Sequence, residues 1–305
     1  MSSIDGRTVS NFKGIGFMLA GAGSFVLNDS LMKLALVEAL PPFEVAFVRG
    51  AAGTLWMMAA LVVLGLVRQV PLAFNRFVVG RGLLEVAAFL TFIIALSHAP
   101  IGDLTAIFQI TPLLIVLGMA LFHRELPSAT LLVLVATGFG GALLVAQPGF
   151  GDTSSYALLA FATALFAALR DLVGRNIPDH TPVLVSTFMT IILVLVFAMF
   201  AGYMTETWHM PALRHLMLLG AAGLLMMLGH IFTFLAFKHA EAQAVAPFYY
   251  AFMIWAVTLG FLMFGDVPNT LAIAGMVLIL VSGLGVIALE RRKSRAVKGQ
   301  PQPPA

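Results

Sequence analysis

The chain has 305 residues, of which 60% are hydrophobic and 10% are charged, and its mean hydropathy is +1.00. These values leave little room for a soluble domain and predict a single membrane domain over residues 1–305. The absence of cysteine excludes disulfide bonds and thiolate-ligated metals. The net charge of +3 is modest, so we expect the lipid bilayer as a partner and no nucleic acid.

Long apolar stretches with few charges follow one another along the chain. A helix needs about 20 mostly apolar residues to cross the hydrocarbon core of a bilayer. On this criterion, and from the turn residues between the stretches, the sequence predicts an all-α polytopic membrane protein with ten transmembrane helices. Their expected ranges are 14–38, 43–67, 79–98, 103–122, 128–147, 155–176, 182–203, 214–237, 242–264 and 268–289.

The distribution of Lys and Arg predicts how the helices are oriented. If both termini are cytoplasmic, nearly all Lys and Arg outside the spans lie on the inner side, with Arg214 as the exception. Residues 290–305 then form a basic cytoplasmic tail. The first apolar stretch carries polar and charged residues and no cleavage pattern, which indicates a retained span rather than a signal peptide. We therefore expect a multi-pass protein of a cytoplasmic membrane with both termini on the cytoplasmic side.

The two halves of the chain match each other at a constant offset. The matched pairs are His98 with His239, Glu125 with Asp266, and Pro127 with Pro268. A second correspondence, shifted by one position, pairs Asp29 and Lys33 with Asp171 and Arg175. Because five helices per repeat is an odd number, equivalent helices have opposite orientation in the membrane, as in many secondary transporters. The predicted inverted repeats cover about 14–147 and about 155–289.

Several short motifs carry a resemblance to a known family. They are Asn28-Asp29 with Lys33, the stretch from Pro42 to Arg49, Arg81-Gly82-Leu83-Leu84, and the stretch from Pro112 to Glu125. With ten predicted helices and two repeats, the chain resembles the EamA-type branch of the drug/metabolite transporter superfamily over nearly its whole length. The resemblance implies secondary-active or facilitative transport of a small organic metabolite by alternating access. It points first to riboflavin uptake, with S-adenosylmethionine or amino-acid carriers as alternatives.

Charged residues inside the first three predicted helices mark a candidate solute pathway, because ionisable groups in a membrane usually face an interior cavity. Asp29 and Lys33 lie four apart on one helix face, which favours either an intrahelical ion pair or a role in a gate. Arg49 could snorkel to water, bridge Asp29 or hold a substrate oxygen. Glu85 is either neutralised by Arg81, one turn earlier, or takes up protons that couple to transport.

The second half contributes a matching set of charges. Asp171 and Arg175 are expected near the side of the membrane opposite to Asp29 and Lys33, so each side would have an acid-base pair that forms when that side closes. In the alternative, Arg170 and Arg175 serve only as positive-inside anchors. We therefore expect six residues to act in gating or coupling: Asp29, Lys33, Glu85, Arg170, Asp171 and Arg175.

Polar and aromatic residues complete the predicted binding site. We expect seven residues to converge on a central cavity and bind the substrate: Asn28, Asp29, Arg49, Gln109, His230, Tyr249 and Tyr250. The repeat places Gln109 in the same position as Tyr250. His230 is either a histidine hydrogen-bonded between helices or a ligand or proton site. The two tyrosines either stack on a heteroaromatic substrate or pack against other helices.

Other function classes find less support in the sequence. His-Glu-x-x-His, Gly-x-Ser-x-Gly and P-loop motifs are absent, and the histidines lack metal-ligand spacing. We therefore expect no enzymatic activity, no cofactor and no metal site. A channel has a similar composition, but two equivalent halves with charges near opposite sides favour a carrier.

Overall fold

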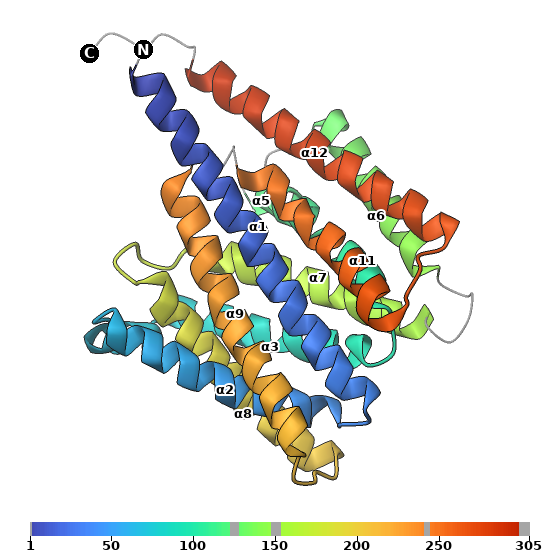
Figure 1. Cartoon of the computed structure of the whole chain (residues 1–305). Helices are drawn as coiled ribbons and strands as arrows, with labels where there is room; N and C mark the ends of the chain where they lie inside the picture. The colour runs from blue at the N-terminus through green and yellow to red at the C-terminus, as the bar shows by residue number, and fades with distance from the viewer. Residues whose placement is uncertain (1, 123–127, 148–153, 241–244, 299–305) are drawn as a thin grey trace.

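The computed structural model describes residues 2–122, 128–147, 154–240 and 245–298, and these residues form helices joined by short connections (Figure 1). The predicted all-α class is confirmed, since the described residues contain no strand. Three residues used in the predicted repeat and motifs, Arg124, Glu125 and Pro127, lie outside the described part of the chain.

The first half of the chain begins with α1 (Ser2–Val37), which starts well before its predicted start. The helices that follow are α2 (Pro42–Val63), the 3-10 helix η1 (Val67–Phe74), α3 (Arg76–Leu96), α4 (Ile101–Phe108), α5 (Thr111–Phe122) and α6 (Ala129–Ala146). α2 ends four residues before its predicted end, and Gly65 follows it with a φ of 69°, which glycine adopts readily. The Asn75 side chain then caps α3 by accepting a 2.9 Å hydrogen bond from the Phe77 amide.

The second half follows the same order of long helices. Its elements are α7 (Ser154–Gly174), α8 (Val183–Thr205), α9 (Leu213–His239), the 3-10 helix η2 (Ala246–Tyr250), α11 (Ala251–Phe264) and α12 (Thr270–Lys298). α12 continues beyond its predicted end at 289. The basic segment from 290 to 298 is therefore part of this last helix. Glu206, just after α8, accepts hydrogen bonds from the amides of Phe43 and Glu44 and so satisfies the free N-terminus of α2.

Two of the predicted helices are divided, and the expectation of continuous helices in these ranges is wrong. The range 103–122 contains α4 and α5, which separate at Gln109 and Ile110. The range 242–264 contains η2 and α11, which meet at Tyr250. Pro112 lies two residues after the first break and Pro247 three residues before the second, and proline lacks the amide hydrogen that the helical ladder needs. Gln109 Nε2 donates to the backbone carbonyl of Tyr249 at 3.1 Å, so the two breaks lie against each other.

The helices have the length and composition of membrane spans. Seven helical stretches among the described residues are long and apolar enough to cross a bilayer, and two shorter apolar stretches are Ala129–Val145 and Phe248–Phe264. Many large apolar side chains are exposed on the outside of the bundle, for example Leu55, Phe200 and Leu262. Lipid tails are the natural environment for such a surface.

Helices from the two halves pack against one another throughout the bundle. α1 lies along α9, α3 lies along α7, and α2 packs on both α8 and α9 (Figure 1). α6 and α12 form a separate close pair, in which a Cβ atom on Gly141 would lie 2.7 Å from the Gly275 carbonyl oxygen. Small residues permit such close packing of backbones where lipid supplies no hydrophobic drive. The central cavity is lined by residues of nine elements: α1, α2, α3, α4, α7, α8, α9, η2 and α11.

Side chains at one end of the bundle join the two halves. We call this end, where α1 finishes, the Val37 side. Glu38 forms an ion pair with Arg214 at 2.7 Å and a hydrogen bond with His215 Nε2 at 2.8 Å. Lys33 pairs with Asp266 at 3.2 Å and donates to the carbonyl oxygen of Ala99 at 2.9 Å. Glu206, which follows α8, binds the first amides of α2. Together these contacts join α1 and α2 to the second half of the chain at this end.

Candidate functional site

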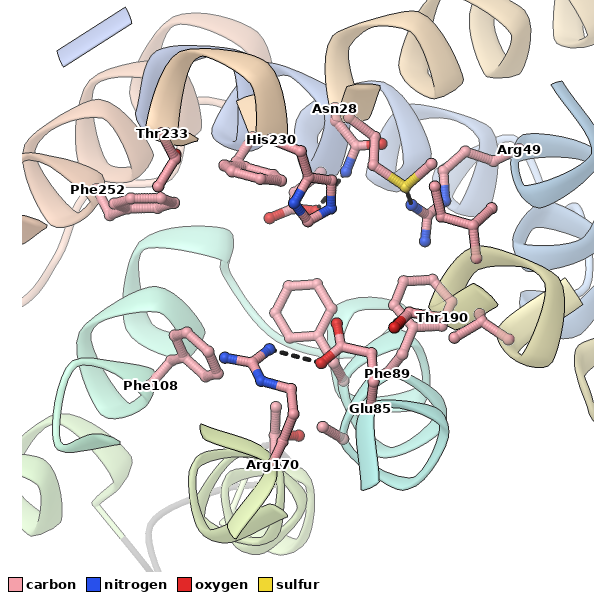
Figure 2. Close-up of a pocket in the computed structure, with 18 of the residues that line it drawn as sticks. Asn28, Arg49, Glu85, Phe89, Phe108, Arg170, Thr190, His230, Thr233 and Phe252 are labelled. Carbon is pink, nitrogen blue, oxygen red and sulfur yellow. Dashed lines mark hydrogen bonds and ion pairs between the residues drawn. The ribbon is translucent and has the colours of Figure 1, made fainter. Parts of the chain in front are cut away.

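A cavity of about 290 Å³ lies at the centre of the bundle and is lined by both halves of the chain. Figure 2 shows two facing walls: one carries Asn28, Arg49 and His230, and the other carries Glu85 and Arg170. The charged residues of the lining are Asp29, Arg49, Arg81, Glu85 and Arg170. Its aromatic rings belong to Phe25, Phe89, Phe92, Phe108, Tyr249 and Phe252. The cavity therefore combines apolar flat surfaces with buried charge of both signs.

Asn28 and Asp29 lie next to each other on α1. Asn28 is 3% exposed, and its Nδ2 donates to Asp29 Oδ1 at 2.8 Å. The Asn28 Oδ1 atom is buried and has no hydrogen-bond partner among the described residues. On the same wall, the His230 ring packs edge-on against Phe25, with 4.9 Å between the centroids. This part of the wall has one carboxylate and one unsatisfied amide oxygen, both of which accept hydrogen bonds.

Arg49, on α2, is 4% exposed, so the snorkelling alternative is wrong. Its guanidinium lies over the ring of Phe89, 4.3 Å from the centroid, in a cation–π contact. Its Nη1 atom points at the sulfur of Met226, and its Nε atom has no partner among the described residues. A thioether is a weak acceptor, so this arginine has no strong hydrogen-bond acceptor among the contacts found in the described residues.

The opposite wall is built around an ion pair between the two halves. Arg170 on α7 contacts Glu85 on α3 at 2.5 Å and its own neighbour Asp171 at 2.7 Å. Arg81 instead donates to the hydroxyl of Thr190 on α8 at 3.1 Å. The ion pair of Glu85 is therefore with Arg170 on another helix, while Arg81, the expected partner one turn earlier, forms no direct ion pair with it among the described contacts. Local spacing on α3 missed a contact that comes from another helix.

The expected acid-base pairs within single helices are also wrong. Lys33 forms its ion pair with Asp266 and not with Asp29, because its side chain extends toward the connection between α11 and α12. Asp171 pairs with Arg170, and Arg175 is an exposed residue just beyond the end of α7. Of these residues, Lys33, Asp171 and Arg175 lie outside the cavity lining, whereas Asp29 lines it.

The remaining predicted site residues divide into two groups. His230 and Tyr249 line the cavity as expected. Gln109 is fully buried and links the two helix breaks, and Tyr250 is 3% exposed and packs against Gly283 of α12. Neither Gln109 nor Tyr250 belongs to the cavity lining. The expectation that these two residues line the cavity is therefore wrong. Tyr249 and Tyr250 are adjacent in a 3-10 helix and therefore point in different directions.

Several lining residues were missed in the sequence because their types are ordinary in membrane helices. Thr163, Thr190 and Thr233 place hydroxyl groups at the cavity, and Met226 places a sulfur beside Arg49. Thr163 also shares a 2.8 Å hydrogen bond with Thr91 across α3 and α7. The described residues contain no group of three or more His, Cys, Asp or Glu side chains that could hold a metal ion.

Known proteins resemble this chain in sequence over most of its length. The pseudopaline exporter of Pseudomonas aeruginosa is 32% identical over 291 residues, which cover 91% of this chain and 96% of the relative. A riboflavin transporter of Vibrio cholerae is 27% identical, with 93% and 95% covered. An S-adenosylmethionine uptake transporter of Rickettsia conorii is 24% identical, with 92% and 94% covered.

A solved structure supports the fold alone. A crystal structure with 18% sequence identity aligns with a TM-score of 0.63 and covers 91% of this chain and 98% of that chain.

The EamA-like transporter family matches the chain twice, over residues 12–147 and 154–288. These matches and the apolar helices identify a multi-pass membrane protein. The chain belongs to the EamA-like transporter family, within the drug/metabolite transporter superfamily.

Proposed function

We propose that this chain is a secondary-active or facilitative carrier that moves a small organic metabolite across the cytoplasmic membrane by alternating access. The observation that carries the proposal is the central cavity, whose charged lining comes from both halves of the chain. Secondary carriers commonly bind their solutes near the middle of the membrane, between two repeats. Glu85 and Arg170 join the halves across one wall of this cavity.

Ten spans in two inverted repeats, about 14–147 and about 155–289, form the single domain in this proposal. The double match to the family supports it, because the matched ranges nearly coincide with the repeats. Helix packing supports it too: α1 on α9 corresponds to α7 on α3 when the halves are exchanged. The helix breaks at Gln109 and at Tyr250 also occupy equivalent places.

The Val37 side faces the periplasm in this proposal, because the distribution of Lys and Arg favours cytoplasmic termini. The contacts of Lys33, Glu38 and Glu206 then close the cavity on the periplasmic side. They break when the carrier opens to that side, which provides the bistable element that alternating access needs. Lys33 keeps its proposed gating role with Asp266 as its partner, while the exposed position of Arg175 supports positive-inside anchoring.

The first substrate to test is riboflavin, moving inward. The aromatic rings of the cavity and the name of the Vibrio cholerae relative support it. A charged metabolite, including S-adenosylmethionine or an amino acid, is the second candidate, favoured by the buried charges of Asp29 and Arg49. Export is the alternative direction, supported by the name of the Pseudomonas aeruginosa relative.

Uptake measurements test the proposed function. Cells that express the chain should accumulate at least one labelled compound from a panel of riboflavin, S-adenosylmethionine and amino acids, and the flux should saturate. A preloaded compound should drive counterflow, because a carrier rebinds solute on both sides. Loss of net accumulation with a protonophore would identify proton coupling, for which Glu85 is the proposed group. Non-saturating flux without counterflow would contradict a carrier.

A further inference from the structure

Resting on the proposed function, we propose that the transported metabolite has an amino-acid-type end, with a carboxylate that Arg49 binds and an amine that Asn28 and Asp29 bind. This inference names a substrate class and assigns a role to each polar group on one wall of the cavity. It also selects the charged candidates over riboflavin, which has no carboxylate.

Arg49 has several strong hydrogen-bond donors but only weak partners for them among the described residues. It lines the cavity, is 4% exposed, and contacts only the sulfur of Met226 and the face of Phe89 among the hydrogen-bond and ring contacts found in the described residues. Its Nε atom is buried without a partner. A guanidinium presents a rigid fork of N–H donors that matches a carboxylate in a bidentate arrangement. A carboxylate in the cavity would therefore give this guanidinium the strong acceptor that it lacks among the described residues.

The other two lining arginines already have partners. Arg170 is paired with both Glu85 and Asp171, and Arg81 donates to Thr190. A carboxylate at either position would compete with an existing contact. Arg49 is thus the lining arginine best able to accept a new anion.

Asn28 and Asp29 provide the matching acceptors. The Asn28 amide is oriented with its Nδ2 donor toward Asp29, because a carboxylate only accepts hydrogen bonds. This orientation leaves Asn28 Oδ1, on a residue that lines the cavity, buried and without a partner among the described residues. An ammonium group has three donors, so it can bind both the free amide oxygen and the carboxylate of Asp29.

The size of the charge at this wall favours a zwitterionic end over a phosphate. Arg49 supplies one positive charge and Asp29 one negative charge, both within the same lining. A phosphate with two negative charges would be repelled by Asp29 and matched by one arginine only. A carboxylate with a neighbouring amine leaves no excess charge in the buried site.

Binding to the purified full chain tests the inference with matched probes. The first set is L-phenylalanine, phenethylamine, which lacks the carboxylate, and 3-phenylpropionate, which lacks the amine. The second set is S-adenosylmethionine and its decarboxylated form, with riboflavin as a neutral aromatic reference. Dissociation constants are measured for the wild type, Arg49→Gln, Arg49→Lys and the control Arg68→Gln, which changes an exposed arginine.

The wild type should bind the carboxylate-bearing amines about 10- to 100-fold more tightly than their decarboxylated forms, as expected for a hydrogen bond between charged groups. Arg49→Gln should remove this preference while leaving affinity for the decarboxylated probes nearly unchanged, which also shows that the variant folds. Arg49→Lys should keep part of the preference, because it retains the charge and loses the fork. Arg68→Gln should bind like the wild type.

Three results would overturn the inference. They are equal affinity of the wild type for a probe and its decarboxylated form, a preference that survives in Arg49→Gln, and no binding of any carboxylate-bearing amine. If the chain still transports riboflavin in the uptake assay, the proposed function stands without the inference. If it transports no compound of the panel, the proposed function fails as well.

Discussion

Replacing Arg170 with methionine should lower the free energy of unfolding by about 2 to 4 kcal/mol. The reason is that Glu85 loses the partner with which it forms its ion pair and stays in an apolar bundle. A fully buried pair that loses one member typically costs about 3 to 5 kcal/mol. We expect somewhat less here, because the Glu85 side chain is 25% exposed to the cavity.

Glu85→Gln should cost less than Arg170→Met, about 1 to 2 kcal/mol, because Arg170 keeps Asp171 as a partner and the glutamine can still accept a hydrogen bond. The double variant should be more stable than the sum of the two single losses predicts, since neither charge is then left alone. Unfolding of the purified chain in detergent gives these values, with Arg68→Met as the exposed control. Additive losses in the double variant would mean that the ion pair does not couple α3 to α7.

Removing the charge of Lys33 should open the cavity toward the Val37 side. Lys33→Met keeps an apolar stem of similar length and removes the bonds to Asp266 and to the carbonyl of Ala99. If these bonds favour the closed state by about 1 to 2 kcal/mol, the open fraction rises roughly 5- to 30-fold. The chain has no cysteine, so a single Ala88→Cys in the cavity lining can report this opening.

The measurement is the rate at which a membrane-impermeant thiol reagent, added on the Val37 side, modifies this cysteine. We expect the rate to rise with Lys33→Met and to return toward the starting value when Lys33→Asp is combined with Asp266→Lys. Lys238→Met, which changes an exposed lysine near the end of α9, is the matched control. An unchanged rate in Lys33→Met would show that this ion pair does not close the cavity.

The sequence predicted the helices well because the bilayer imposes a simple requirement. In hydrocarbon, the backbone N–H and C=O groups must form their hydrogen bonds within helices. The length of an apolar stretch is therefore enough to mark a span. Helix ends were less accurate, since α1 and α12 continue into regions where apolar length gives no signal. The breaks at Gln109 and Tyr250 depend on the packing of two helices against each other, which no single stretch reveals.

Residue type predicted several charged residues of the cavity lining, whereas their ion-pair partners were not predicted. Asp29, Arg49, Glu85 and Arg170 line the cavity because charges in apolar helices must face an interior space. Their partners could not be read from helical spacing, which relates only residues three or four apart. Lys33 and Asp266 lie in opposite halves of the chain and meet only in the folded bundle.

The expectation that both Tyr249 and Tyr250 line the cavity was wrong because the two residues are adjacent. Successive side chains diverge by about 100° in an α-helix and by about 120° in the 3-10 helix Ala246–Tyr250. The ring of Tyr250 consequently lies on Gly283, while Tyr249 faces the cavity.

Alternating access is tested most directly by labelling the Ala88→Cys variant, with Lys33 and Asp266 intact, from each side of the membrane in turn. The cysteine should react readily from the side where α1 begins and slowly from the Val37 side, because in the proposed carrier the contacts of Lys33, Glu38 and Glu206 close the latter. A transported compound should change the two rates in opposite directions, since it shifts the balance between two states. Rapid labelling from both sides at once, with rates that no compound changes, would indicate an open pore and contradict the carrier.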